Sequence, residues 1–133
     1  MLIYVDTVIL IYFYDHTGLF NTRATNRMNA LIAIDDQIAT SDLVRLEYRV
    51  KPMRFGDNVA LATFDTFFYR PDVRVLPITP AVFERATFIR ATHNFKLGDS
   101  LHLAAAVIGG CDRYLTNDAR LAAFTGIAVE VLP

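Results

Sequence analysis

The chain has 133 residues, of which 53% are hydrophobic and 20% are charged, and its formal net charge is −1. This composition excludes an intrinsically disordered chain, and the length favours a single domain over residues 1–133 with a hydrophobic core of its own. The near-neutral charge gives no general attraction to nucleic acid. It does not exclude an anionic substrate, because a cluster of acidic active-site residues would leave the remaining surface positive.

Cysteine use and the first residues predict a cytoplasmic protein. Cys111 is the only cysteine and cannot form an internal disulfide, which is typical of a reducing compartment. We expect it to be a small packed residue rather than a reactive thiol. The apolar run at residues 1–14 contains Asp6 and is shorter than the about 20 residues that cross a membrane. It also lacks the layout of a signal peptide, so we expect no contact with a membrane.

A buried strand and an apolar helix are predicted on either side of Asp6. Residues 2–5 form a continuous apolar run rich in β-formers, as in a strand buried on both faces. Residues 7–12 are also apolar and fit either a buried helix or a continuation of the strand. We favour the helix, because a carboxylate in the middle of a core strand would cost considerable free energy.

The next part of the chain predicts two helices with a short strand between them. A loop, the first helix and the strand are expected at residues 15–21, 23–34 and 37–40. Ser41 suits the N-cap of the second helix, over residues 42–51. Pro52 would end that helix.

Glu47 is out of place in this second helix. Leu43, Val44 and Val50 define the apolar stripe, and Glu47 lies three or four residues from each of them, on the face that we expect to be buried. An unpaired buried carboxylate costs on the order of several kcal/mol, so something should compensate its charge. A structural salt bridge and a metal site account for Glu47 equally well at this point.

The second half of the chain continues the alternation of helices and strands. Asp57 suits the cap of a helix whose phenylalanines fit a core or a homodimer face better than a base-stacking surface. Thr79 and Pro80 are a strong helix start, for a helix that runs to residue 93. The other expected elements are strands at 73–78, 113–116 and 127–131 and helices at 99–108 and 118–124.

This alternation predicts an α/β fold with a mainly parallel sheet of four or five short strands and helices on both faces. Ligands of such sheets bind beyond the carboxyl ends of the strands. Asp6 and Asp118 both follow strands, and Asp99 begins a helix that runs antiparallel to the strand before Asp118. Glu47 lies about two turns into a helix that begins at the same edge. We therefore expect these four carboxylates to converge.

Four converging carboxylates would repel one another unless a cation neutralised them. Oxygen ligands favour Mg²⁺ or Mn²⁺, and the scattered positions of His16, His93 and His102 argue against zinc. Such an ion could activate water for phosphodiester hydrolysis. The alternative is that the aspartates are helix caps, which we favour for Asp118 alone but not for Asp6.

Four segments resemble the signature segments of PIN-domain ribonucleases, above all the VapC toxins of bacterial toxin–antitoxin pairs. They are VDT, LVRLEYRVKP, LGDSLHLAAA and LTNDARL, at residues 5–7, 43–52, 97–106 and 115–121. Each segment is short, but four in this order over nearly the whole chain are specific. The resemblance implies a three-layer α/β/α PIN-like domain and a Mg²⁺-dependent endoribonuclease, with Mn²⁺ as the alternative ion, that a cognate antitoxin inhibits.

The resemblance also implies the roles of individual residues. The catalytic acidic residues would be Asp6, Glu47, Asp99 and Asp118. Of these, Asp6 and Asp99 would bind the metal directly, and the other two through water. Thr7 and Thr116 match positions whose hydroxyls orient the acidic residues or their waters. Val8 is a departure, because the family commonly has Ser or Asn there, and it removes one polar contact near the metal.

Partners are implied in the same way. Family members usually form homodimers and bind an antitoxin segment across the active-site groove. A basic group around Glu47 would contact RNA or the antitoxin, although a solvated helix face explains its charge pattern equally well. Its members are Arg45, Arg49, Lys51 and Arg54. For His102 we favour a packed, hydrogen-bonded histidine over a proton carrier.

Three other functions remain as alternatives with different requirements. A PIN-like module that binds RNA or protein without cleavage would show no metal-dependent turnover. A phosphatase with an aspartate nucleophile would require a second Asp two residues after Asp6, where Val8 stands. A phospho-acceptor signalling domain would require an acidic pair after the first strand and a Lys after the last, and neither is present.

Overall fold

The computed structural model describes residues 1–15 and 18–133. Its parallel sheet has the order β3-β2-β1-β4-β5. The strands are β1 (Leu2–Val5), β2 (Gln37–Ser41), β3 (Val73–Leu76), β4 (Arg113–Thr116) and β5 (Ala128–Val131). The helices are α1 (Thr7–Tyr14), α2 (Gly18–Ala33), α3 (Asp42–Arg54), α4 (Asn58–Phe68), α5 (Pro80–His93), α6 (Leu97–Ile108) and the 3₁₀ helix η1 (Ala119–Ala123).

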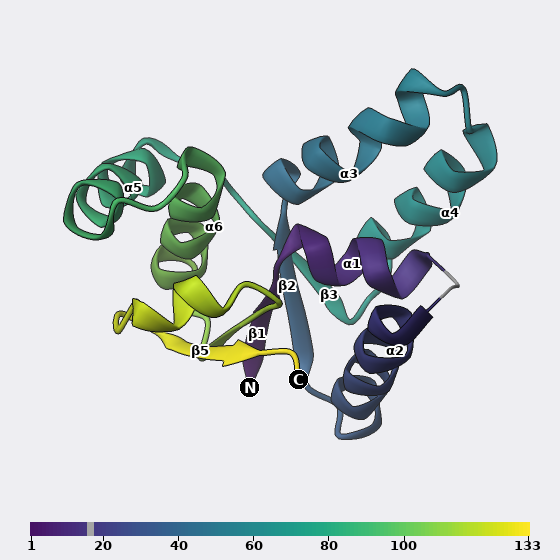
Figure 1. Cartoon of the computed structure of the whole chain (residues 1–133), viewed down its shortest axis with the longest axis horizontal. Helices are drawn as coiled ribbons and strands as arrows, with labels where there is room; N and C mark the ends of the chain where they lie inside the picture. Colours follow the sequence, from purple (N-terminus) through teal and green to yellow (C-terminus); the bar gives the residue numbers. More distant parts are fainter. Residues whose placement is uncertain (16–17) are drawn as a thin grey trace.

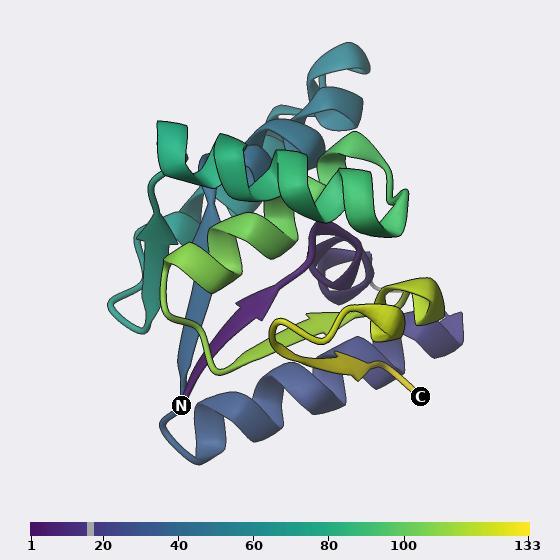
Figure 2. The same cartoon turned by 90° about the vertical axis from the view of Figure 1, so that its left-hand side faces the viewer.

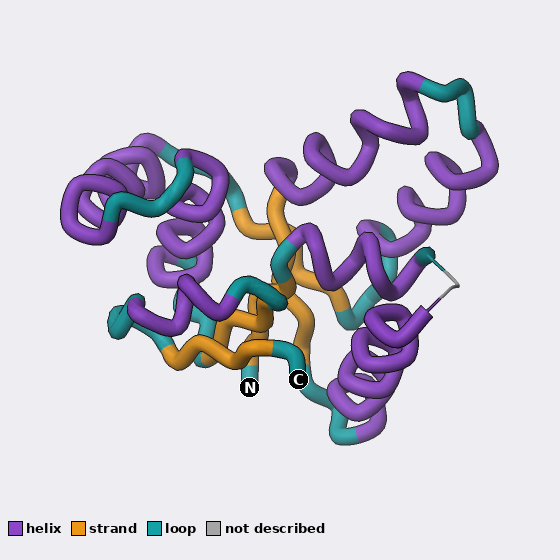
Figure 3. Tube along the Cα trace, viewed as in Figure 1, coloured by secondary structure: helices purple, strands orange, loops and turns teal. Residues whose placement is uncertain are grey.

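The helices form layers on both faces of the sheet. In Figure 1, α5 and α6 lie on one side of the strands and α1 and α2 on the other, and the turned view of Figure 2 shows the sheet between them. Helices α3 and α4 form a hairpin that extends outward from the sheet, whose strands occupy the centre of the molecule in Figure 3. The expected three-layer α/β/α fold with a parallel sheet is confirmed.

Strand β1 is the centre of the core because it has a neighbour on each side and a helix layer on each face. All four of its residues are buried. Tyr4 is paired in register with Ala39 of β2 and with Tyr114 of β4, and all three are fully buried. The continuous apolar run that predicted a doubly covered strand therefore reflects the actual packing. Among the described residues, no helix is long and apolar enough to cross a membrane.

Three predicted boundaries were wrong at prolines or at a loop. Helix α3 continues past Pro52 to Arg54, because a proline in the last turn removes only one backbone donor. Strand β3 ends at Leu76 rather than at residue 78, since Pro77 has no N–H to offer the sheet. Helix α2 already begins at Gly18 within the expected loop at 15–21, of which residues 16 and 17 lie outside the described residues.

The early start of α2 has a physical reason in its contact with α1. Asn21 donates from Nδ2 to the carbonyl oxygens of Tyr12 and Phe13, at 2.9 and 3.2 Å. These are carbonyls that the last turn of α1 leaves without intrahelical partners. The expected helix at 118–124 is a 3₁₀ helix over residues 119–123 with Asp118 as its cap, and α6 begins two residues earlier than expected.

Candidate active site

Asp6 lies directly beyond β1, at the edge where the parallel strands end. Its backbone N–H donates to the carbonyl of Leu115 at 2.9 Å, and its side chain is the N-cap of α1, accepting from the N–H of Thr7 at 2.7 Å. The residue is 7% exposed. Burial raises the pKa of Asp6 above its ordinary value, and the charge of Asp99 raises it further. Asp6 is therefore a helix cap whose surroundings disfavour its ionised form.

Thr116 joins the ends of β1 and β4. Its hydroxyl donates to Oδ2 of Asp6 at 2.8 Å, and the same hydroxyl oxygen accepts from the backbone N–H of Asp118 at 3.1 Å. Thr116 is fully buried. Thr116 thus holds the carboxylate of Asp6 and the backbone at Asp118, and its role toward an acidic cluster stays a prediction.

Asp99 lies in the first turn of α6 and faces the same edge. It is half-buried, and no side chain among the described residues forms a hydrogen bond or an ion pair with it. Burial, and after it the charge of Asp118, raise the pKa of Asp99 above its ordinary value. Asp99 therefore opposes the ionisation of Asp6, and Asp118 opposes that of Asp99.

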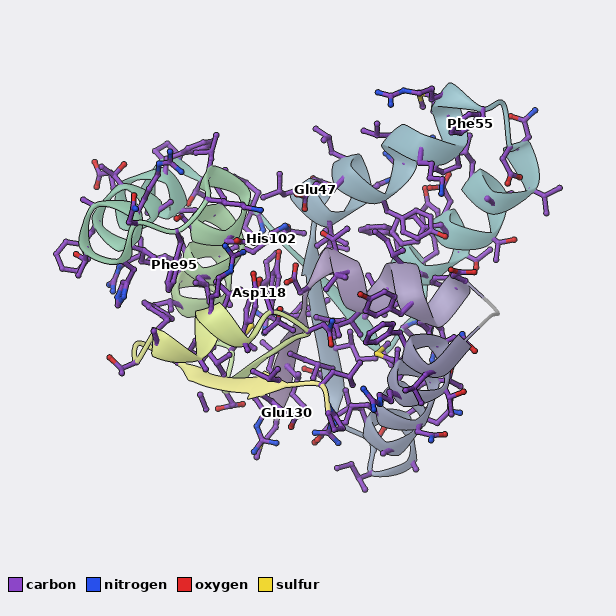
Figure 4. All side chains as sticks on the ribbon, viewed as in Figure 1. Glu47, Phe55, Phe95, His102, Asp118 and Glu130 are labelled. Atoms are coloured by element: carbon purple, nitrogen blue, oxygen red, sulfur yellow. The ribbon has the colours of Figure 1, made fainter. Side chains whose placement is uncertain are left out.

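Glu47 reaches this region from α3 and contacts His102 of α6, as Figure 4 shows. Nε2 of His102 donates to Oε1 of Glu47, and the hydroxyl of Thr7 donates to the same oxygen at 2.7 Å. Burial alone would raise the pKa of Glu47, but the interactions with His102 and, after them, the hydrogen bond from Thr7 outweigh it and hold the pKa below the ordinary value. Thr7 thereby supports Glu47 rather than Asp6 with its hydroxyl.

The expected burial of Glu47 was wrong. Its side chain is 38% exposed, and Val50, assigned to the same apolar face, is 46% exposed. Helix α3 extends outward from the sheet, so only Val44 of this helix is fully buried. The side chain that contacts Glu47 is the imidazole of His102, and the metal alternative stays a prediction.

Asp118 is tied to Arg120. Its carboxylate accepts from the backbone N–H of Arg120 at 3.0 Å and from two guanidinium nitrogens at 3.0 and 2.6 Å. The hydrogen bond from Arg120 is the largest cause that lowers the pKa of Asp118. The cap that we favoured for Asp118 is confirmed, while its role toward a metal stays a prediction.

The predicted basic group divides into two parts. Arg45 and Arg49 form ion pairs with Asp65 of α4, at 3.4 and 3.6 Å. Lys51 lines a hollow of about 340 Å³ between α1, α3 and α4, whose wall includes Glu47 and continues to Phe55. Two of the four cations are therefore engaged within the α3–α4 hairpin.

His102 and Tyr4 are the site residues that sequence reasoning undervalued or missed. His102 is 1% exposed and sits among hydrogen-bonding partners, as the packed-histidine prediction requires. One of these partners is the hydroxyl of Tyr4, at 2.7 Å from Nδ1. Tyr4 lies in an apolar strand, where its pattern signals only core. Val8, the departure from the family pattern, packs against the hydrophobic core.

The donor set fits a hard divalent cation chemically. It consists of carboxylate and hydroxyl oxygens, and two of the carboxylates are buried enough to resist ionisation. A cation beside Asp6 and Asp99 would remove that cost. As the side chains stand, residues 1–15 and 18–133 contain no group of three or more His, Cys, Asp or Glu residues arranged to hold a metal ion.

Comparison with known proteins gives a family and a set of similar folds. The family profile of the PIN domain matches residues 3–127. VapBC2 from Rickettsia felis, solved with a fragment of promoter DNA, has a TM-score of 0.81 at 15% identity, with 100% of both chains covered. A comparison with curated protein sequences found no match.

Two further solved structures have the same fold. VapC20 from Mycobacterium tuberculosis, described as a toxin that cleaves the sarcin-ricin loop, has a TM-score of 0.74 at 20% identity, covering 95% of this chain and 98% of that one. FitAcB from Neisseria gonorrhoeae has a TM-score of 0.70 at 19% identity, covering 96% and 95%. At these identities the likeness establishes the fold.

Proposed function

Because the chain belongs to the PIN domain family, we propose that it is a divalent-metal-dependent endoribonuclease and the toxin of a toxin–antitoxin pair. The observation that carries this proposal is the position of Asp6 and Asp99 at the carboxyl edge of the sheet, where the charge of Asp99 raises the pKa of Asp6. We take residues 1–133 as one PIN domain.

In this proposal Asp6 and Asp99 hold the ion directly, and Glu47 and Asp118 act through water. A bound Mg²⁺ or Mn²⁺ polarises a phosphoryl oxygen and lowers the pKa of a bound water. Carboxylate donors suit either ion, and Mg²⁺ is the one we propose.

The chain's own residues prepare this site. Thr116 holds the carboxylate of Asp6 by a hydrogen bond of 2.8 Å. Thr7 and His102 hold the carboxylate of Glu47 by hydrogen bonds. Because these hydrogen bonds fix the acidic side chains, the side chains need less reorganisation when a cation binds.

RNA and an antitoxin are the proposed partners. The exposed end of α3 carries Lys51, which lines the same hollow as Glu47. An RNA phosphate or an acidic antitoxin segment would meet this cation on its way to the acidic edge, the part of the sheet edge that carries Asp6 and Asp99. One solved relative, from Klebsiella pneumoniae, is described as a toxin–antitoxin complex. A homodimer and a cytoplasmic location belong to the same proposal.

A binding module without catalysis is the second candidate, favoured by two observations. Arg120 occupies the carboxylate of Asp118, and Val8 offers no polar side chain near Asp6. In a module of this kind the acidic edge would not bind a metal tightly enough for turnover.

Incubation of the purified chain with bulk transfer RNA distinguishes the two candidates. The nuclease should cleave when Mg²⁺ or Mn²⁺ is added, and a chelator should stop cleavage. Retention of RNA in a gel-shift assay with no cleavage at any concentration of either ion would favour the binding module and contradict the nuclease.

A further inference from the structure

A continuous chain of buried hydrogen bonds connects β2 to the acidic edge. The hydroxyl of Tyr4 lies 2.8 Å from Oγ of Ser41 and 2.7 Å from Nδ1 of His102. The other ring nitrogen of His102 contacts Glu47. Tyr4, Ser41 and His102 are each no more than 1% exposed, so water does not compete for the bonds among these three residues.

Counting protons gives the chain a direction. The carboxylate of Glu47 can only accept, so Nε2 of His102 carries a proton and donates it. If Tyr4 donates to Nδ1 and Ser41 donates to Tyr4, every proton in the chain has an acceptor. In the reverse direction the hydroxyl proton of Ser41 would have no acceptor among the described residues, which is costly in a buried site.

The end of this chain determines where the carboxylate of Glu47 lies. Glu47 comes from α3, which extends outward from the sheet, and its side chain is 38% exposed, so packing alone does not hold it. Its second oxygen lies against the first turn of α6, where a Cβ added at Gly98 would be 3.2 Å away. His102 and Gly98, one turn apart on α6, thus both adjoin the carboxylate of Glu47.

We propose that Tyr4 is a positioning residue that acts through His102 to aim Glu47 at the metal-binding edge. Tyr4 holds the tautomer of His102 whose Nε2 proton points to Glu47, because its hydroxyl proton occupies Nδ1. The inference rests on the proposed function, since it assigns Tyr4 a part in the same acidic site.

The neighbouring strand contains a matched control. Tyr114 of β4 stacks on Tyr4 with ring centroids 5.4 Å apart and an angle of 6° between the planes. It is equally buried, but its hydroxyl has no hydrogen-bond partner among the described residues. Tyr4→Phe and Tyr114→Phe therefore remove the same atom from adjacent rings, and only the first removes a link to Glu47.

The first test measures Mn²⁺ binding to the purified chain by isothermal titration calorimetry. Loss of a hydrogen bond behind a metal site typically weakens affinity about 10- to 100-fold, so we expect Tyr4→Phe to raise the Kd for Mn²⁺ by about tenfold. Tyr114→Phe should leave the Kd within about twofold of the wild type. Its hydroxyl has no bond that leads to Glu47, and residues that share no partner affect one another by no more than about 0.5 kcal/mol. Equal Kd values for the two variants would overturn the inference.

A double-mutant cycle tests whether Tyr4 acts through His102. His102→Gln keeps a donor toward Glu47 but loses the ring nitrogen that Tyr4 contacts. In this background Tyr4→Phe should produce no further loss of Mn²⁺ affinity. A full additional loss would mean that Tyr4 affects the metal by another route and would contradict the proposal.

A third measurement uses the wild-type chain without metal, so it requires no variant to fold. In ¹⁵N NMR spectra of the metal-free wild-type chain, His102 should carry its proton on Nε2, with Nδ1 shifted as a hydrogen-bond acceptor. A proton on Nδ1 would overturn the inference. If the wild type shows this tautomer but binds no Mn²⁺ and cleaves no RNA, the proposed function fails while the hydrogen-bond chain stands, so the two failures are distinguishable.

Discussion

Thr116 donates a hydrogen bond of 2.8 Å to Asp6, and this contact joins two residues that are 110 positions apart in the chain. It holds together the carboxyl ends of β1 and β4, the two strands between which the acidic edge lies. The carboxylate that it supports is 7% exposed and resists ionisation. Thr116 therefore contributes both to the fold and to the charge state of the candidate site.

Replacing Thr116 by Val tests this contact, since the two side chains have nearly the same shape. A hydrogen bond to a charged group contributes about 1.5–3 kcal/mol, so Thr116→Val should lower the free energy of unfolding by about that amount at neutral pH. Thr40→Val is the control, because the hydroxyl of Thr40 is buried without a partner among the described residues. Urea denaturation of both variants gives the comparison, and equal stabilities would contradict the role of Thr116.

The pKa of Asp99 predicts a stability that changes with pH in the metal-free chain. Burial and then the charge of Asp118 raise this pKa above 3.8, so the folded chain binds the proton more tightly than the unfolded chain. Ionisation of Asp99 at neutral pH therefore costs stability, and Asp99→Asn should raise the free energy of unfolding by up to about 1 kcal/mol. The gain should shrink as the pH falls through the raised pKa and disappear below 3.8.

Asp118→Asn provides a control of opposite sign. The hydrogen bond with Arg120 lowers the pKa of Asp118, so its ionised form stabilises the fold above the unfolded pKa of 3.8. This substitution should therefore lower stability at neutral pH, by no more than about 1 kcal/mol because the ion pair is exposed. Thermal denaturation in the presence of a chelator, at several pH values, checks both variants. A loss of stability in Asp99→Asn at pH 7 would contradict the charge coupling at this edge.

Gly98→Ala separates stability from site geometry. Alanine favours a helix by about 1 kcal/mol over glycine, so the stability of the chain should stay the same or rise. The new Cβ would lie 3.2 Å from Oε2 of Glu47 and push this carboxylate by a few tenths of an ångström. We expect weaker Mn²⁺ binding by calorimetry, and no added loss when the same substitution is made in a Glu47→Gln chain. Unchanged affinity in Gly98→Ala would indicate that Glu47 does not contribute to the metal site.

Much of the fold could be predicted from the sequence because local patterns determine it. The apolar run before Asp6 and the alternation of strands with helices are local signals, and they led to the parallel sheet and the edge where ligands bind. Thr79 with Pro80 marked the start of α5 for the same reason. The errors at Pro52 and Pro77 were errors of position within an element.

The side-chain contacts at the site could not be predicted in this way. The helical period alone placed Glu47 on a buried face. The side chain is exposed because α3 extends outward from the sheet, which the period does not indicate. The contact of Tyr4 with His102 depends on how α6 packs against β1. These two residues are 98 positions apart in the chain, so no local pattern predicts their contact. The ion pair of Asp118 with Arg120, in contrast, joins residues only two positions apart in the chain.

The central claim is that Asp99 belongs to a metal-dependent nuclease site, and cleavage of transfer RNA by purified Asp99→Asn tests it most directly. The carboxylate of Asp99 has no hydrogen bond among the described residues, so the substitution should leave the fold intact. Loss of a residue that hydrogen-bonds to a metal ligand already lowers metal affinity or activity about 10- to 100-fold. Loss of a proposed ligand should therefore reduce Mg²⁺-dependent cleavage by at least about 100-fold. Glu84→Gln, an exposed change of the same kind on α5, should cleave like the wild type. Wild-type cleavage rates in a folded Asp99→Asn chain would contradict the account.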